Sequence, residues 1–292
     1  MSKANVGLVA PKELGPGFRR DERREETMTS RPIVILGCGR LGSAIVEGWL
    51  LTHAVDPAEL IILTPSSKPA AERAGSLGAR INPPSEVLSD ARAVVVAVKP
   101  AIWRAACAPI AQHLAPDTVI VSVMAGVRAA DLSVAFAGQP VARVMPTTAV
   151  AKGQGVAALH ADDAAARAVA CDLFEPLADV VDLDDEGLMD VATAVAGSGP
   201  AYLHAFTQAL AKAGEGSGLS PDVALRLARG AARSAAASAQ GPETLEGLIA
   251  QVASPGGTTR AGLAALNAGS RLDAAVAEAV AAALARAREL SA

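Results

Sequence analysis

Residues 32–42, PIVILGCGRLG, decide the fold of this chain. A short β-branched run ends at Leu36 and passes directly into the pattern Gly37-x-Gly39-x-x-Gly42. In a strand–turn–helix unit the first glycine makes the tight turn, the second lets a pyrophosphate approach the backbone, and the third lets the helix pack on the strand. The free N–H groups at the start of the helix, expected over residues 43–51, favour an anion. The stretch therefore predicts a dinucleotide-binding turn of the Rossmann type.

The rest of the chain has two kinds of sequence pattern, one before and one after about residue 185. Apolar runs of four to six residues alternate with helical stretches such as residues 70–77, which is typical of a mostly parallel sheet with crossover helices. The further strands are expected at residues 60–63, 93–98, 119–123, 143–145, 156–159 and 180–183. From about residue 185 the chain is rich in alanine at helical spacing, without strand-like runs.

These patterns predict an α/β protein with two domains. A Rossmann-type dinucleotide-binding domain is expected over residues 31–185, followed by an all-helical C-terminal dimerisation and substrate domain over residues 186–292. Residues 1–30 combine a Pro/Gly stretch with mixed charges and are predicted to be a disordered N-terminal extension.

Composition excludes several classes of protein. A net charge of −4 and only 2% aromatic residues argue against nucleic-acid binding. Three widely spaced cysteines without a CxxC pair argue against a disulfide framework or a zinc site, so a cytoplasmic protein with no metal is expected. The longest uncharged stretch, residues 191–211, is too polar for a membrane span. It is interpreted as a buried loop and helix of a soluble protein.

The segment after the second expected strand bears on the coenzyme. An acidic residue there would hold the ribose 2′-hydroxyl of NAD and repel a 2′-phosphate. The chain instead reads Thr64-Pro65-Ser66-Ser67-Lys68, with hydroxyls and a cation but no carboxylate. This favours NADPH, with NADH as a second possibility, although an ordinary polar turn has the same composition.

A second glycine-rich loop, Ser254-Pro255-Gly256-Gly257-Thr258-Thr259, lies between expected helices. It offers backbone N–H groups to a carboxylate and threonine hydroxyls to a ring nitrogen. Considered alone, the same residues are equally typical of a capped helix–helix turn. The four histidines are scattered and no general acid stands out.

The order and spacing of seven segments resemble the pyrroline-5-carboxylate reductase family over residues 32–290. The segments are GCGRLG at 37–42, AVKP at 97–100, MAGV at 124–127, RVMP at 143–146, DEGLMD at 185–190, GSGPAY at 197–202 and SPGGTT at 254–259. The resemblance implies reduction of 1-pyrroline-5-carboxylate to L-proline with NAD(P)H, the last step of proline biosynthesis. It also implies a homodimer with interlocked helical domains, and dimers that assemble into rings.

By the family pattern, two sets of residues form the site. The cofactor-binding set is Leu36, Gly37, Cys38, Gly39, Arg40, Leu41, Gly42, Thr64, Asn82, Ala97, Val98, Lys99, Pro100, Met124, Ala125 and Gly126. The substrate-binding set is Glu186, Gln251, Ser254, Gly256, Gly257, Thr258 and Thr259, with the Thr259 hydroxyl as the catalytic group at the ring nitrogen. A protonated cyclic imine accepts hydride without a strong acid, so positioning and electrostatics suffice.

The chain departs from the family pattern in places. Thr147 and Ala149 replace an asparagine and a proline, Gln208 replaces an acidic residue, and Gly230-Ala231 replaces a Gln-Thr pair. A paralogue acting on another cyclic imino acid, or a non-catalytic NADP-binding regulatory protein, are therefore the alternatives. A β-hydroxyacid dehydrogenase would need a catalytic lysine, and the single lysine after Lys152, Lys212, lacks the supporting motif.

Overall fold

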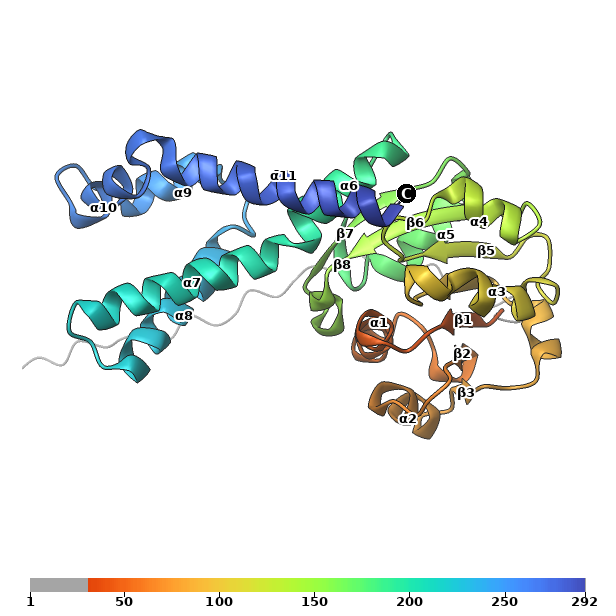
Figure 1. Ribbon diagram of the computed structural model, residues 1–292. Coiled ribbons are helices and arrows are strands. Elements are labelled where there is room, and N and C mark those ends of the chain that lie inside the picture. The colour runs from red at the N-terminus through yellow and green to blue at the C-terminus, as the bar shows by residue number, and fades with distance from the viewer. Residues whose placement is uncertain (1–30, 292) are drawn as a thin grey trace, which may run out of the picture. The chain divides into compact units, whose positions relative to one another are not determined.

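A computed structural model describes residues 31–291, and the extension predicted over residues 1–30 lies outside them. An eight-stranded sheet has the order β3-β2-β1-β4-β5-β6-β7-β8 (Figure 1). The strands are β1 Ile33–Leu36, β2 Leu60–Leu63, β3 Arg80–Ile81, β4 Ala93–Val96, β5 Val119–Ser122, β6 Val141–Pro146, β7 Gly155–His160 and β8 Ala178–Asp182. Neighbouring strands are parallel except β6 and β7. The predicted mostly parallel sheet is confirmed.

Helices cover both faces of this sheet. The crossover helices are α1 Arg40–Thr52, α2 Pro69–Ser76, α3 Trp103–Ala111, α4 Ala129–Ala135 and α5 Ala164–Phe174. Because side chains alternate along a strand, Ile33 and Ile35 of β1 pack into one core with α1, α2 and α5. Val34 and Leu36 pack into the second core with α3 and α4. Trp49 of α1 is fully buried, and its Nε1 donates to Leu173 O at 2.9 Å.

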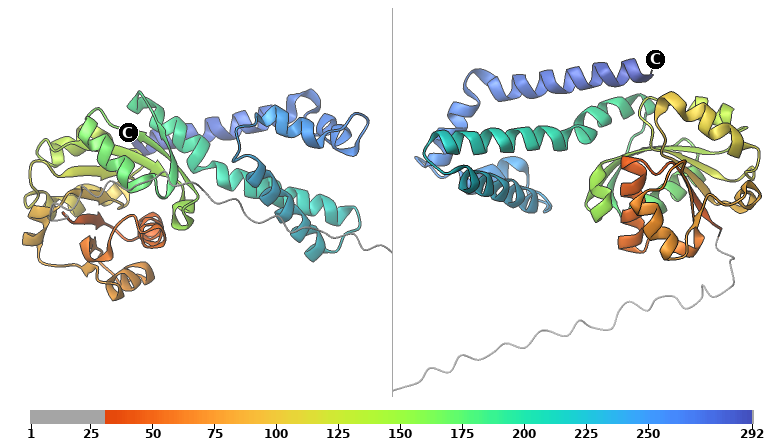
Figure 2. Two further views of the ribbon diagram at one scale, coloured as in Figure 1. Left: turned by 180° about the vertical axis from the view of Figure 1, so that it is seen from behind. Right: turned by 60° about the horizontal axis from the view of Figure 1, so that its bottom comes forward.

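The chain beyond the sheet is helical. Its helices are α6 Met189–Ala192, a π-helical turn at Thr193–Gly197, α7 Gly199–Gly216, α8 Pro221–Ser238, α9 Leu245–Val252, α10 Thr258–Leu266 and α11 Arg271–Ser291. Helices α7 and α8 pack side by side, and α11 packs on α6 and the π-helical turn (Figure 2). The Tyr202 hydroxyl of α7 donates to Ala279 O of α11 at 3.4 Å. Short 3-10 turns occur at Pro57–Glu59, Ser85–Asp90, Pro100–Ile102, Thr148–Lys152, Glu186–Leu188 and Ala268–Ser270.

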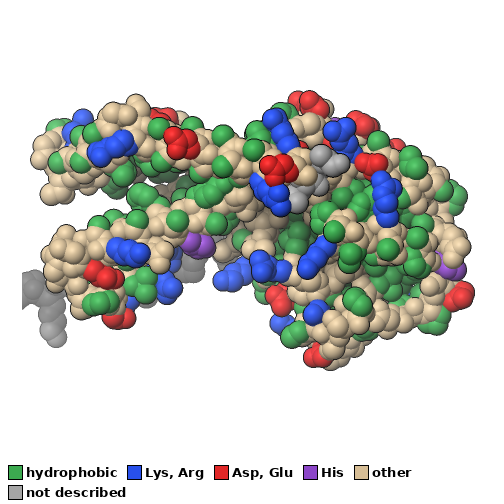
Figure 3. All heavy atoms as spheres, viewed as in Figure 1, with side chains coloured by type: hydrophobic (Ala, Val, Ile, Leu, Met, Phe, Trp, Pro, Cys, Tyr) green, Lys and Arg blue, Asp and Glu red, His purple; other side chains and the backbone are tan. Residues whose placement is uncertain are grey.

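These helices bury little within the single chain. From α7 onward, the buried residues of the described part are all alanines: Ala211, Ala224, Ala228, Ala253 and Ala287. Large apolar side chains lie on the surface instead, as the green side chains in Figure 3 show. The exposed set includes Leu203, Phe206, Leu210, Leu227, Ile249 and Val252.

One expectation needs correction, and one strand was not expected. Residues 191–211 were expected to form a buried loop and helix, but they form a nearly continuous helix from α6 through the π-helical turn into α7. Most of α7 is exposed. The strand β3 was not predicted, since its two residues lie exposed at the sheet edge and form no apolar run.

Candidate functional site

The glycine turn has the geometry that its sequence predicted. Gly37 has a φ of +100°, and a Cβ there would lie 2.8 Å from Ala97 O. A Cβ on Gly42 would lie 2.1 Å from Gly37 O, so only glycine lets α1 pack this closely. Gly39 differs, because a Cβ there would meet no atom within 4 Å. It is the N-cap of α1, so the free N–H groups of the first helical turn face open space beside it.

The predicted cofactor residues gather at one edge of the sheet. The Gly37 N–H donates to Leu63 O at 2.8 Å, and the Ala97 N–H donates to Leu36 O at 2.8 Å, which joins the ends of β1, β2 and β4. The turns after β1, β2, β3, β4 and β5 supply the predicted residues from Leu36 to Gly42, Thr64, Asn82, Ala97 to Pro100 and Met124 to Gly126. Strand order reverses between β1 and β4, and the crevice at such a point binds ligands in α/β proteins.

Thr64 and Asn82, which follow β2 and β3, are hydrogen-bonded to each other. The Thr64 N–H donates to Asn82 Oδ1, and Asn82 Nδ2 donates to Thr64 O, both at 2.8 Å. Beside them lies a pocket of about 300 Å³. Its lining residues are Thr64, Pro65, Ser66, Ser67, Lys68, Ala71, Glu72, Ile81 and Asn82.

Glu72 adds a carboxylate to the lining of this pocket. Residues 64–68 contain no carboxylate, but α2 carries Glu72 back to the same pocket. The Ser67 hydroxyl donates to Glu72 Oε1. The signal for this residue was its spacing, because Glu72 stands four residues after Lys68, the N-cap of α2, and so one helical turn along.

Glu186 lies at the junction between the sheet and the helices. Its Oε1 accepts from Arg143 Nη1 of β6 at 2.9 Å and from the Ala129 N–H at 2.7 Å. The Arg143 side chain is 5% exposed, and its Nε has no hydrogen-bond partner. The carboxylate also stabilises the start of α4, since Ala129 is the first residue of that helix. Arg143 belongs to the segment at 143–146, but no local pattern indicates that it pairs with Glu186.

Thr147 occupies a backbone-supporting position. Its N–H donates to Val156 O at 3.0 Å, and its hydroxyl accepts from the Val156 N–H at 3.3 Å. The side chain is 7% exposed. The departure from asparagine at this position therefore gives a residue that secures the turn from β6 to β7.

The second glycine-rich loop is compact and exposed. Gly256 has a φ of +72°, and the Gly257 N–H donates to Ser254 O at 3.0 Å. Gly257 is the N-cap of α10, so Thr258 and Thr259 begin that helix with free N–H groups. Within residues 31–291, no hydrogen bond or ion pair joins residues 254–259 to the glycine turn or to a strand. Gln251 precedes the loop on α9 and is also exposed.

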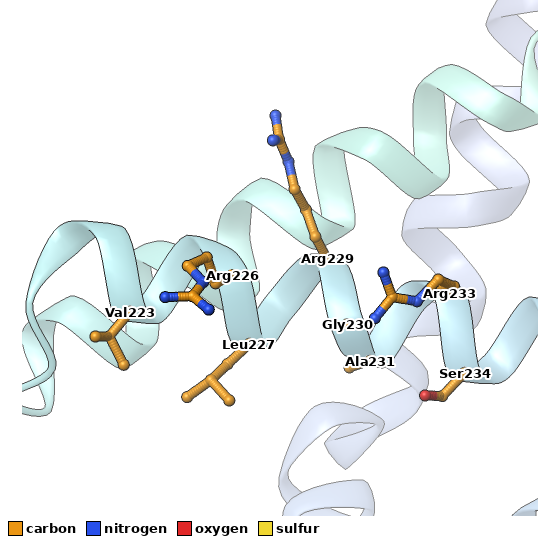
Figure 4. A pocket seen from close by; sticks show the side chains of 8 residues that line it. All are labelled: Val223, Arg226, Leu227, Arg229, Gly230, Ala231, Arg233 and Ser234. Carbon is orange, nitrogen blue, oxygen red and sulfur yellow. The ribbon is translucent and has the colours of Figure 1, made fainter.

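A groove of about 680 Å³ runs along α8 (Figure 4). It is lined by Val223, Arg226, Leu227, Arg229, Gly230, Ala231, Arg233 and Ser234. The Gly230-Ala231 departure from the family pattern therefore lies on this surface.

Among the described residues, no group of three His, Cys, Asp or Glu side chains forms a metal site. No described helix is long and apolar enough to cross a membrane.

The fold and the glycine turn define an NAD(P)-dependent oxidoreductase with a Rossmann domain and a helical domain. Residues 32–126 match the family described as NADP oxidoreductase, coenzyme F420-dependent, and residues 186–290 match pyrroline-5-carboxylate reductase dimerisation. A pyrroline-5-carboxylate reductase of Pseudomonas aeruginosa is 36% identical over 275 residues, covering 90% of this chain and 98% of that protein. The chain belongs to the pyrroline-5-carboxylate reductase family.

Other proteins similar to this chain carry the same family name. The pyrroline-5-carboxylate reductase of Arabidopsis thaliana is 31% identical over 88% of this chain and 94% of its own length. The solved structure of a pyrroline-5-carboxylate reductase from Coxiella burnetii has a TM-score of 0.82 at 26% identity, covering 90% of this chain and 99% of the other. A Plasmodium falciparum pyrroline carboxylate reductase with NADP bound has the same fold, with a TM-score of 0.74 at 23% identity over 90% and 98% of the two chains.

Proposed function

We propose that this chain reduces 1-pyrroline-5-carboxylate to L-proline, with NADPH as the coenzyme and NADH as a second one. The observation that carries this proposal is the glycine turn, in which Gly39 leaves open space at the start of α1 in a chain of this family. The Thr64–Asn82 pair follows β2 and β3, next to the glycine turn after β1, where a dinucleotide with its pyrophosphate at the turn places its adenine half.

The coenzyme, when bound, supplies the hydride. The chain's own residues then hold and orient it. The N–H groups of the first turn of α1 hold the pyrophosphate, and the pocket at Thr64 and Asn82 takes the adenine half. The turns Ala97 to Pro100 and Met124 to Gly126 hold the nicotinamide half at the ends of β4 and β5.

The loop at residues 254–259 binds the substrate in this proposal. The carboxylate docks beside Gly256 and Gly257 on the free N–H groups of Thr258 and Thr259 at the start of α10, and the Thr259 hydroxyl accepts a hydrogen bond from the N–H of the ring iminium. Ser254 stands over Gly257, where a Cβ would lie 2.5 Å from its Oγ. Gln251 and Glu186 complete the substrate-facing set. An iminium bound in this way needs no general acid, because it is already protonated.

Two copies of the chain are needed to complete this site. The loop has no hydrogen bond to the glycine turn within the described chain, and α7 to α11 expose apolar side chains that a second copy would cover. We assign residues 31–185 to the coenzyme domain and residues 186–292 to the dimerisation and substrate domain. Rings of dimers are included in this proposal.

The proposed location is the cytoplasm. All three cysteines are free, and burial raises the pKa of the Cys107 thiol to about 12, which keeps it protonated. Cysteines without disulfides suit a reducing compartment.

The test is the oxidation of NADPH by the purified protein with pyrroline-5-carboxylate, and with a six-membered cyclic imine in parallel. Thr259→Ala is expected to lower kcat/KM by an amount that corresponds to a loss of about 1–3 kcal/mol of transition-state stabilisation, because one hydrogen bond to the reacting ring is lost. Thr259→Ser keeps the hydroxyl and should recover most of the activity. Turnover of the six-membered imine alone would favour the paralogue, and coenzyme binding without any turnover would favour the regulatory protein.

A further inference from the structure

The pocket beside Thr64 and Asn82 holds opposing charges. Lys68 and Glu72 both line it, and the Glu72 carboxylate accepts the hydroxyl proton of Ser67. Glu72 lies in the first turn of α2, where the positive end of the helix favours a carboxylate. The pocket therefore contains a carboxylate whose negative charge is stabilised by the dipole of its own helix.

The position of this pocket decides which part of a dinucleotide meets it. In Rossmann folds, the end of the second strand faces the ribose of the adenine half, whose 2′ position carries a hydroxyl in NADH and a phosphate in NADPH. Thr64 directly follows β2 and Asn82 directly follows β3, and both line the pocket, which places it at the end of the second strand. This step rests on the proposed function, since it takes the crevice as the coenzyme site.

The two coenzymes place different demands on Ser67 and Glu72. A 2′-phosphate needs hydrogen-bond donors and is repelled by a carboxylate, while a 2′-hydroxyl can itself donate to that carboxylate. The Ser67 hydroxyl has one proton to donate, and Glu72 already accepts it. A 2′-phosphate therefore competes with Glu72 for the same donor, whereas a 2′-hydroxyl does not.

We infer that Glu72 is a specificity-determining residue that lowers the preference of this chain for NADPH over NADH. Lys68 acts in the opposite direction, because it lines the same pocket and its positive charge attracts the phosphate. The pair sets a balance between the two coenzymes. The hydroxyls and the cation of residues 64–68 alone would have favoured NADPH more strongly.

The experiment measures dissociation constants by calorimetry for NADPH and NADH, and for adenosine 2′,5′-bisphosphate and adenosine 5′-monophosphate. The last two carry only the adenine half and report on binding without turnover. In Glu72→Gln, the ratio of Kd for NADH to Kd for NADPH is expected to rise about three- to tenfold, as for removal of one exposed charge and one charged acceptor. The two fragments should show the same shift.

Two further variants sharpen this test. Glu175→Gln removes the same charge at an exposed position at the end of α5, and it should leave both ratios unchanged. Ser67→Ala removes the contested donor, so in that background Glu72→Gln should raise the ratio clearly less. An equal rise with and without Ser67 would overturn the competition for its hydroxyl.

The two proposals fail in different ways. If wild-type protein binds both coenzymes and Glu72→Gln leaves their ratio unchanged, the role of Glu72 is overturned while the proposed function stands. If wild-type protein binds neither coenzyme nor either fragment, the coenzyme site itself is overturned, and the role of Glu72 with it.

Discussion

The sheet region of this chain, which runs from β1 to β8, and its helical region, which runs from α6 to α11, bury their side chains very differently. The core of the sheet region includes Trp49, Phe136 and Phe174, all fully buried. From α7 onward, the buried residues of the described chain are alanines, while Leu203 and Val252 are 68% and 67% exposed. The two regions have similarly regular secondary structure, so the difference lies in packing.

This difference shows which region is complete within one chain. Burying a leucine or valine side chain contributes about 1.5–3 kcal/mol relative to leaving it exposed. The sheet region collects this contribution from strands covered on both faces. The apolar side chains of α7 to α11 that lie exposed in the single chain do not make this contribution there, so we expect the stability of the helical region to depend on association.

The largest expected effect tests the completeness of the sheet region. Gly42→Ala places a Cβ 2.1 Å from Gly37 O, a backbone atom that cannot move without opening the turn. We expect it to lower the free energy of unfolding by about 3 kcal/mol or more, measured by urea denaturation.

Gly39→Ala is the matched control in the same turn. Its Cβ meets no atom within 4 Å, so the free energy of unfolding should change by less than about 0.5 kcal/mol. The Kd for NADPH should nevertheless rise about tenfold or more, because the methyl group occupies the approach of the pyrophosphate. Equal stability losses in the two variants would contradict the geometry of the turn.

The next effect tests the incompleteness of the helical region. Leu227 lies in the groove on α8 and is 58% exposed (Figure 4). Leu227→Asp should raise the dimer Kd about a hundredfold, measured by sedimentation velocity, since a charge would be buried at the association surface. Val134→Asp on α4 makes the same kind of change at an 82% exposed position in the sheet region. A dimer weakened equally by both variants would remove α8 from the interface.

The smallest of the three effects concerns the junction between the regions. Glu186→Ala leaves the buried Arg143 without its carboxylate and should lower the free energy of unfolding by about 2 kcal/mol. Asp172→Ala breaks the ion pair with Arg92, whose side chains are 60% and 41% exposed, and should cost less than about 1 kcal/mol. Similar costs for both variants would show that the Glu186 pair does not couple the sheet to the helices.

Much of the fold follows from local patterns. The runs at residues 60–63 and 119–123 lie at β2 and β5, since buried parallel strands need continuous apolar residues. The pattern could not reveal β3, whose Arg80 and Ile81 are held by pairing with β2 rather than by burial. It also could not reveal that β6 and β7 run antiparallel, because strand direction depends on the connection between them.

The candidate site divides in the same way. Gly37, Gly39 and Gly42 have the backbone conformations and spacing that their motif predicts, because each role is set within six residues. Contacts between distant segments were not predictable, since neither the Glu186–Arg143 pair nor the Ser67–Glu72 contact in the pocket leaves a mark on a local pattern. The roles of Gln251 and Thr259 remain predictions.

The few aromatic side chains are divided between the regions. The chain has two tryptophans and one tyrosine. Trp49 and Trp103 both belong to the sheet region, where Trp103 lies against the Arg104 guanidinium at 4.4 Å, and Tyr202 belongs to α7. Tryptophan fluorescence therefore follows the melting of the sheet region alone. The unmodified protein thus carries an optical reporter confined to one region, and comparison of its melting curve with the loss of helical circular dichroism shows whether the two regions unfold together or in sequence.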